Sequence, residues 1–260
     1  MRREQSRPGV SGRPQGWGLA RLSGFLPTTN RLAIRLLDAG VSALLLVMML
    51  PTFALVSLAI RLESPGGTFY RCRRVGQHGR ELYLLKFRKM HADAAGPVLT
   101  VLDDRRLTRV GRFLAQWKLD ELPQLWSVLR GEMSLVGPRP EDPHFVAVAP
   151  EAFREILALR PGITGLSQLA FANETSLLRD ADPYTYYVER LLPQKLQLDR
   201  LYAQRRSVWL NIKILAWTAR VVLFGSSVAV DRQTAMLTVR HQRPQTFSLA
   251  SLEQAEQSQQ

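Results

Sequence analysis

The sequence contains very little cysteine and histidine, with one cysteine, Cys72, and 4 histidines among 260 residues. A single cysteine excludes an internal disulfide, and no group of Cys and His residues has the spacing of a zinc site. These absences argue against a disulfide-stabilised secreted domain and against a structural zinc domain. They fit a chain that functions in a reducing, cytoplasmic setting.

Acidic residues are scarce relative to basic ones. The chain has 35 Lys and Arg against 22 Asp and Glu, a net charge of +13. This excess favours an anionic partner, namely nucleic acid, anionic lipid or a phosphorylated substrate. The length suits one large domain or two small ones. A secretory signal is not expected, because the apolar run starts late and no small-residue cleavage site follows it.

One stretch, from Ala39 to Ile60, lacks charge altogether. It is long enough to cross a bilayer, which takes about 20 residues, but Pro51 lies just past its middle and breaks a backbone hydrogen bond there. Both flanks are basic, so the positive-inside rule places both in the cytoplasm. The flanking residues are Arg31, Arg35, Arg61, Arg71, Arg73 and Arg74. We therefore expect a re-entrant membrane helix over 31–63, broken at Pro51. A straight span and a buried soluble helix are the alternatives.

The rest of the chain divides into a folded region between two polar tails. Residues 1–30 predict a disordered basic tail and residues 229–260 a disordered Gln-rich one. Between the membrane helix and the second tail, 64–228 form the expected cytoplasmic catalytic domain. The expected fold class is α/β and mainly helical, with a small β-hairpin made by 68–72 and 81–87. Helices are expected over 107–117, 151–159, 191–202 and 207–224. The last is apolar but carries two cations, so it either lies on the membrane interface or packs in the core.

Two neighbouring carboxylates, Asp120 and Glu121, are the first candidates for a catalytic site. The apolar residues after them recur at helical spacing, which predicts a helix with Pro123 in its first turn and Gly131 just past its end. These apolar residues are Leu122, Leu125, Trp126 and Leu129. A helix start favours negative charge and attracts phosphate. The alternative is a solvated helix cap.

Basic residues complete the candidate site. Arg139 lies in a rigid loop, because a glycine and two prolines surround it. Arg160 precedes a Pro-Gly pair and is a second candidate phosphate ligand, with a surface arginine as the alternative. Lys86 and Arg88 belong to a run of three cations in four residues, which is a substrate-binding stretch, a solvated edge or a lipid-facing patch. A carboxylate pair that faces an oriented guanidinium suits metal-assisted phosphate chemistry.

Taken together, these residues resemble the bacterial sugar transferase family, the monotopic polyprenyl-phosphate phosphoglycosyl transferases that start the assembly of surface glycans. The resemblance covers about 31–225. Five blocks carry it in order: Arg74-Val75-Gly76 with Gly79; Lys86-Phe87-Arg88-x-Met90; Leu119-Asp120-Glu121-Leu122-Pro123-Gln124-Leu125; Gly131-x-Met133-Ser134-Leu135-Val136-Gly137-Pro138-Arg139-Pro140; and Arg160-Pro161-Gly162-Ile163-Thr164-Gly165. The resemblance implies a re-entrant helix broken at a proline, which matches Pro51, and a place on the cytoplasmic face of the bacterial inner membrane.

The resemblance also implies a reaction. A sugar-1-phosphate passes from a nucleotide diphosphate sugar, expected to be a UDP-sugar, to undecaprenyl phosphate, and UMP leaves. Asp120 would be the nucleophile that forms a phosphosugar–aspartyl intermediate, and Glu121 would hold Mg²⁺. Lys86, Arg139 and Arg160 would contact phosphates or the nucleotide sugar. The implied partners include membrane lipid and no nucleic acid, and the implied pathway is exopolysaccharide, O-antigen, capsule or glycoprotein glycan synthesis.

Some positions depart from the family pattern. Lys118 stands where serine is usual, Ala115 where a basic residue is frequent, and Ser127 where asparagine is usual. These changes affect sugar recognition and the phosphate contacts near Asp120. Two other functions remain open: a membrane-anchored, non-enzymatic protein whose basic face binds anionic lipid, and a glycosyltransferase that releases UDP in place of UMP.

Overall fold

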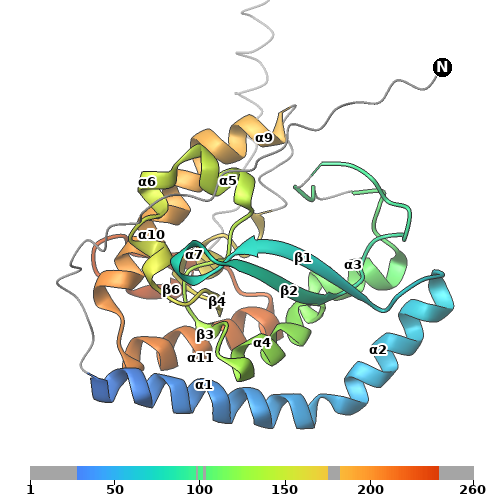
Figure 1. Ribbon diagram of the computed structural model, residues 1–260, viewed down its shortest axis with the longest axis horizontal. Coiled ribbons are helices and arrows are strands. Elements are labelled where there is room, and N and C mark those ends of the chain that lie inside the picture. Colours follow the sequence, from blue (N-terminus) through green and yellow to red (C-terminus); the bar gives the residue numbers. More distant parts are fainter. Residues whose placement is uncertain (1–27, 98, 102–103, 175–181, 240–260) are drawn as a thin grey trace, which may run out of the picture.

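The computed structural model describes residues 28–97, 99–101, 104–174 and 182–239. Figure 1 shows two N-terminal helices that form a bent arm along one side of the molecule, with the other elements gathered against it. Within the described residues the fold is mainly helical, with three two-stranded sheets. This agrees with the predicted α/β class. Of the predicted disordered tails, residues 1–27 and 240–260 lie outside the described residues, and the prediction for 28–30 is wrong because α1 begins at Thr28.

The arm consists of α1 (Thr28–Met48) and α2 (Leu50–Glu63), which meet at an angle of 58°. Met49 separates them, and Pro51 occupies the first turn of α2. A straight helix is disfavoured at this point, because proline has no N–H and its ring clashes with the carbonyl four residues earlier. The predicted helix break at Pro51 is therefore confirmed. In the part of the chain that the structure describes, the length and apolarity needed to cross a membrane are found in this bent pair together and in no single helix.

One side of the arm carries large exposed apolar side chains. They include Leu32, Leu36, Leu44, Val47, Leu55, Leu58 and Leu62. The other side packs on the domain through buried residues such as Ile34 and Ile60. Exposed apolar area on this scale marks a surface that meets a partner or a membrane.

Two charged residues of α1 fix the arm to the domain. Arg35 donates from both terminal nitrogens to the carbonyls of Val128 and Leu129, at 2.6 Å each. Asp38, 1% exposed, accepts from the Ser134 hydroxyl at 2.7 Å and from the Leu135 N–H at 3.0 Å. We call Arg35 and Asp38 the α1 anchor. Both lie near the charge-free run, and the sequence did not predict this contact.

The predicted hairpin is confirmed and is longer than expected. Strands β1 (Phe69–Val75) and β2 (Glu81–Phe87) pair antiparallel from Phe69 opposite Phe87 to Val75 opposite Glu81. A 3₁₀ turn at Gln77–Gly79 connects them. The side chains of Cys72, Leu82 and Leu84 face the main core. The far end of the hairpin touches the loop after β3, because the Val75 N–H donates to the Glu141 carbonyl at 3.0 Å.

A second sheet forms the centre of the domain. Strands β3 (Ser134–Val136) and β4 (Gly162–Thr164) pair in parallel, with Ser134 opposite Gly162. Only glycine fits at 162, since a Cβ there would lie 2.0 Å from the Gly137 nitrogen. Loops were expected from the glycines and prolines of these two segments. The segments instead approach closely enough to pair as strands. Val128, Met133, Leu166 and Ile214 are among the fully buried residues around this sheet.

Short helices connect and cover these strands. They are α3 (Arg109–Gln116), the 3₁₀ helix η2 (Leu119–Gln124), α4 (Leu125–Arg130), α5 (Pro143–Val148), α6 (Pro150–Phe153), a 3₁₀ turn (Ile156–Ala158), α7 (Leu166–Ala170) and α9 (Pro183–Tyr186). The helix predicted over 151–159 is therefore wrong as one element. It divides into α6 and the 3₁₀ turn.

The C-terminal part contains two longer helices and a hairpin. A π-helical turn (Tyr187–Leu191) leads into α10 (Leu192–Arg205), and α11 (Val208–Phe224) follows. On α11, Asn211 and Ile214 are buried whereas Trp209 and Phe224 are exposed, so this helix has a core face and an outer face. The disordered tail predicted from 229 is wrong in its first part, because β5 (Val228–Val230) and β6 (Leu237–Val239) pair antiparallel.

Candidate active site

A small pocket lies between β2, η2 and the loop that follows β3. Its charged and polar lining residues are Arg74, Lys86, Glu121, Gln124 and Arg139, and we call it the charged pocket. Three of the sequence candidates, Lys86, Glu121 and Arg139, therefore meet in one place although 53 positions separate the first from the last, from 86 to 139. Such a convergence of opposite charges in a hollow is a common mark of a functional site.

The acidic pair lies in a short 3₁₀ helix that precedes the predicted α-helix. Asp120 and Glu121 belong to the 3₁₀ helix η2, and the α-helix α4 begins only at Leu125. Lys118 precedes η2 in a left-handed conformation, at φ 56°. That conformation is uncommon for a residue with a side chain. Trp126, one of the apolar residues at helical spacing, is 50% exposed.

Glu121 is held by two cations. Its carboxylate lies 2.6 Å from Lys86 Nζ and 3.7 Å from an Arg139 nitrogen. Burial alone would raise the pKa of Glu121, but the charges of Lys86 and Arg139 outweigh it and hold that pKa well below its usual range. Glu121 is therefore ionised at neutral pH, as the sequence analysis expected from its position.

Asp120 is more buried than Glu121 and faces a different cation. The residue is 2% exposed, and Lys89 Nζ lies 3.4 Å from its carboxylate. Lys89 in turn lies against α3, where Gly111 permits the contact: a Cβ at 111 would sit 1.9 Å from the Lys89 carbonyl oxygen. The two carboxylates thus sit side by side in sequence, each with its own lysine from the same end of β2.

Arg139 is positioned by a second set of buried residues. Asp199 lies buried close to the Arg139 backbone N–H and to Ser167, and burial raises the pKa of Asp199 to about 7. Nearby, the Tyr187 hydroxyl donates to Glu141 at 2.9 Å, and Lys195 Nζ contacts Glu174 at 2.8 Å. Burial alone would lower the pKa of the Arg139 guanidinium, but Glu121 together with the carboxylates of Glu141 and Glu174 raises it.

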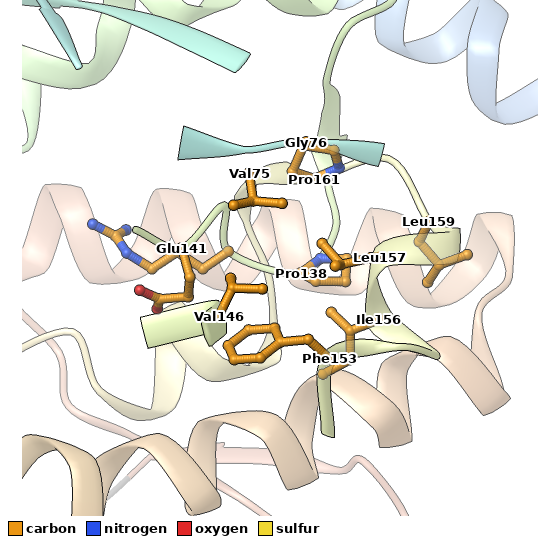
Figure 2. Close-up of a pocket in the computed structure, with 11 residues that line it drawn as sticks. Val75, Gly76, Pro138, Glu141, Val146, Phe153, Ile156, Leu157, Leu159 and Pro161 are labelled. Atoms are coloured by element: carbon orange, nitrogen blue, oxygen red, sulfur yellow. The ribbon is translucent and has the colours of Figure 1, made fainter. Parts of the chain in front are cut away.

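An apolar pocket lies on the other side of the same loop (Figure 2). Figure 2 shows Val146, Phe153 and Ile156 facing Val75 and Pro138 across it, with Glu141 at one edge. These side chains come from α5, α6, the 3₁₀ turn and the end of β1. Arg139 lines this apolar pocket as well as the charged one, so the loop that carries it lies between the two.

Two predicted substrate ligands lie elsewhere. The guanidinium of Arg88 donates to the carbonyls of Pro65 and Ser64, at 2.5 and 2.7 Å, and so closes the turn after α2. Arg160 has Arg35, Asp38 and Arg206 as its charged neighbours, which places it by the α1 anchor. Neither side chain is among those that line the charged pocket. The sequence showed both cations but gave no information on the direction of their side chains.

The sequence analysis missed three polar residues at this site. Arg74 lines the charged pocket and contacts Asp142 at 2.6 Å. Lys89 was noted only as part of a cationic run, and Gln124 only as part of a motif. No local signal identifies these residues, because their place depends on how the hairpin meets η2.

The acidic pair was also tested as a magnesium site. In the described ranges, no group of three or more His, Cys, Asp or Glu residues is arranged to hold a metal ion. Magnesium does not require such a group, since it is often bound by one or two carboxylates together with substrate phosphates and water. The hard oxygen ligands of Asp120 and Glu121 fit that mode of binding.

Comparison with known proteins gives a family. The model of the family described as bacterial sugar transferase matches residues 29–225. The UDP-glucose:undecaprenyl-phosphate glucose-1-phosphate transferase of Caulobacter vibrioides is 41% identical over 195 residues, which cover 73% of this chain and 69% of the relative. An undecaprenyl-phosphate glucose phosphotransferase of Komagataeibacter xylinus is 36% identical over 228 residues, 81% of this chain and 41% of the relative.

A third relative, from Xanthomonas campestris pv. campestris, is also a UDP-glucose:undecaprenyl-phosphate glucose-1-phosphate transferase by name. It is 36% identical over 194 residues, 72% of this chain and 38% of the relative. This chain therefore spans about two fifths of the length of the second and third relatives. The family match extends from α1 to the end of α11, through every element that forms the charged pocket. The chain is therefore an enzyme that belongs to the bacterial sugar transferase family.

Proposed function

We propose that this protein is a phosphotransferase that moves a sugar-1-phosphate from a UDP-sugar to undecaprenyl phosphate and releases UMP. The observation that carries the proposal is the charged pocket, where an ionised carboxylate and two cations face one another. The names of the relatives support the substrate class. Because those relatives are named for glucose, UDP-glucose is the first donor to test.

The proposed reaction has two displacements at one phosphorus atom. An Asp120 carboxylate oxygen attacks the phosphorus that carries the sugar, the bond to the UMP oxygen breaks, and UMP leaves with that electron pair. A phosphate oxygen of undecaprenyl phosphate then attacks the same phosphorus and displaces Asp120. The product is a lipid-linked sugar diphosphate, and the kinetics are ping-pong. Since Asp120 is 2% exposed, its carboxylate must become accessible when the donor binds.

Asp120 itself is not among the residues that line the charged pocket but precedes Glu121, which is, and the residues of the pocket have supporting roles in this proposal. Lys86 and Arg139 balance the negative charge of the two phosphates and orient them. The Asp120–Glu121 pair would hold Mg²⁺, with Glu121 as the main ligand, and the ion would offset phosphate charge as the carboxylate approaches. Arg88 and Arg160 are left out of the pocket, because their guanidinium groups lie elsewhere.

The proposed location is the cytoplasmic face of a bacterial inner membrane, with the arm inserted in one leaflet. Three observations support it: the 58° bend, the exposed apolar side of α1 and α2, and basic residues on both flanks. A re-entrant arm keeps the pocket at the lipid surface, where the phosphate of a polyprenyl lipid lies. Cysteines introduced at Asn30 and Arg61 in a Cys72→Ala background should both be labelled from the cytoplasmic side. Labelling from opposite sides would rule out the re-entrant arrangement.

The decisive assay measures UMP release across a panel of UDP-sugars in the presence of undecaprenyl phosphate. We expect UMP together with a lipid-linked sugar diphosphate. Release of UDP would instead indicate a glycosyltransferase that leaves the phosphate behind. Anionic-lipid binding with no nucleotide product from any donor would indicate the non-enzymatic alternative.

A further inference from the structure

The charged pocket contains a polar group that has no partner. Gln124 is 2% exposed, and its side-chain nitrogen Nε2 makes no hydrogen bond in the described structure. Gln124 also lines the pocket, together with Lys86, Glu121 and Arg139. Most buried N–H groups in folded proteins have a hydrogen-bond partner, and one that lacks a partner lowers the stability of the protein. An orphaned donor that borders a charged pocket therefore calls for an acceptor from outside the chain.

The 3₁₀ geometry of η2 explains why this side chain shares the pocket with Glu121. A 3₁₀ helix has about three residues per turn, so side chains at i and i+3 eclipse one another. Glu121 and Gln124 stand in that relation, at positions 3 and 6 of the helix Leu119–Gln124. The carboxylate and the amide are therefore carried on one face of a single short turn.

The charges around the pocket indicate what kind of acceptor arrives. Arg74, Lys86 and Arg139 are all cations, and Glu121 is already paired with two of them. An extra neutral donor beside these cations suits an anionic oxygen, to which hydrogen bonds are stronger than to a neutral one. A sugar hydroxyl also donates a hydrogen bond, and the lysine and arginine side chains of the pocket provide no acceptor for it.

We propose that Gln124 is a substrate-binding residue whose amide N–H donates to an oxygen of the phosphoryl group that is transferred with the sugar. The inference rests on the proposed function, and it adds a contact to the phosphate that stays on the sugar. In the free protein the amide is unpaired. When the donor binds, the β-phosphate of the UDP-sugar supplies the missing acceptor.

Nucleotides that differ by one phosphate test the proposal directly. UDP contains the phosphate that corresponds to the transferred group, and UMP lacks it. We expect Gln124→Met, which keeps the side-chain volume and removes the donor, to raise the Kd of UDP about 10- to 100-fold. The Kd of UMP should stay within about twofold, and UMP release from the UDP-sugar should fall by a factor similar to that for UDP binding.

The stability of the same variants separates a binding role from a packing role. Because Nε2 has no partner in the free protein, Gln124→Met should unfold at the same temperature as the wild type or higher. Gln124→Glu, which puts a second carboxylate beside Glu121, should weaken UDP binding more than Gln124→Met. Gln116→Met, at an exposed position at the end of α3, is the matched control and should change neither binding nor stability.

Three results would overturn the assignment. An unchanged Kd for UDP in Gln124→Met would remove the contact. An equal loss of UDP and UMP binding at unchanged stability would move the contact to the nucleotide, and an equal loss with a lower unfolding temperature would make Gln124 a packing residue. A wild-type protein that binds neither nucleotide and releases no UMP would instead refute the proposed function itself, and the role of Gln124 with it.

Discussion

Two groups of charged residues in this protein differ in how completely they are paired. In the α1 anchor, each hydrogen-bonding group that we describe has a short contact: Arg35 at 2.6 Å to two carbonyls, and Asp38 at 2.7 and 3.0 Å. At the charged pocket, Arg139 lies 3.7 Å from Glu121, Lys89 lies 3.4 Å from Asp120, and Gln124 Nε2 has no partner. The hydrogen bonds of the α1 anchor are made within the chain, whereas the charged pocket has a donor, Gln124 Nε2, that is available to a ligand.

This difference shows how buried polar groups can be sorted. Complete pairing contributes stability and leaves nothing to offer a substrate. Incomplete pairing costs stability, and at the charged pocket a bound substrate would supply the missing partner. Substitutions at the two places should therefore have opposite signatures. Changes at the anchor should lower stability more than activity, and changes at the pocket should lower activity more than stability.

The largest expected effect is on activity, at Asp120 beside the pocket. Asp120→Asn keeps the shape of the side chain but removes the charge of the proposed nucleophile. We expect turnover to fall by roughly 10⁴-fold or more, with no labelled phosphosugar adduct on the protein and an unfolding temperature close to that of the wild type. Radiolabelled UDP-sugar and thermal unfolding measure the two quantities. Asp93→Asn, at an exposed site, is the matched control, and near-normal turnover of Asp120→Asn would refute the nucleophile assignment.

The next effect is on stability at the anchor. Asp38→Ala leaves the Leu135 N–H and the Ser134 hydroxyl buried without an acceptor, so the free energy of unfolding should fall by about 2–4 kcal/mol. The turnover of the molecules that remain folded should change little. Denaturant unfolding in detergent tests the first statement and assays at low temperature test the second. Ser42→Ala is a useful comparison, because Ser42 Oγ on the same helix is buried without a partner and its removal should be neutral or stabilising. An equal loss in both variants would contradict the interpretation.

The third expected effect is a pH dependence of the protein's stability, caused by the buried carboxyl group of Asp199. Burial raises the pKa of Asp199 from 3.8 to about 7, so between these values the folded protein retains a proton that the unfolded chain has released. Stability should therefore fall as pH rises through this window, by on the order of 2 kcal/mol from about pH 5.5 to 7, and then level off. Asp199→Asn keeps an acceptor for the Arg139 N–H and should flatten the profile. A variant with the same slope as the wild type would show that another group titrates.

The smallest expected effect concerns backbone strain beside the pocket. Lys118 has φ 56°, and a glycine adopts this conformation without a Cβ penalty. Lys118→Gly should raise the free energy of unfolding by about 0.5–1 kcal/mol. His78→Gly provides the comparison, because His78 has φ 59° in the hairpin turn, away from the pocket. Both substitutions should stabilise the protein to a similar extent in denaturant unfolding, but only Lys118→Gly should change the rate of UMP release.

Features with a local signal were predicted well from the sequence. The hairpin followed from runs of β-forming residues around glycines, and the helix break followed from Pro51, whose effect on the backbone does not depend on tertiary contacts. The acidic pair was found because two carboxylates preceded a helical pattern. The turn that carries them is 3₁₀ rather than α, since the left-handed Lys118 and the position of Pro123 shorten the first part of the helix.

Features that depend on contacts between distant segments were not predicted. Strands β3 and β4 have three residues each, too few for a period to be visible, and their pairing depends on two glycines that meet across the sheet. Arg88 and Arg160 were predicted as substrate ligands, and their side chains lie outside the charged pocket, because a sequence does not say which way a long side chain turns. The α1 anchor was missed since Asp38 looked like the boundary of a charge-free run.

The two helices of the arm are attached to different elements that adjoin the pocket. At one end, the α1 anchor joins α1 to α4 and β3. At the other, Glu63 at the end of α2 accepts the first two N–H groups of α3, at 2.6 and 2.9 Å, and α3 packs against η2. A force that changes the angle at Met49 therefore pulls on both attachments at once. With the arm inserted in one leaflet as proposed, the thickness and lateral tension of the lipid would act on the spacing between the acidic pair and the arginine loop.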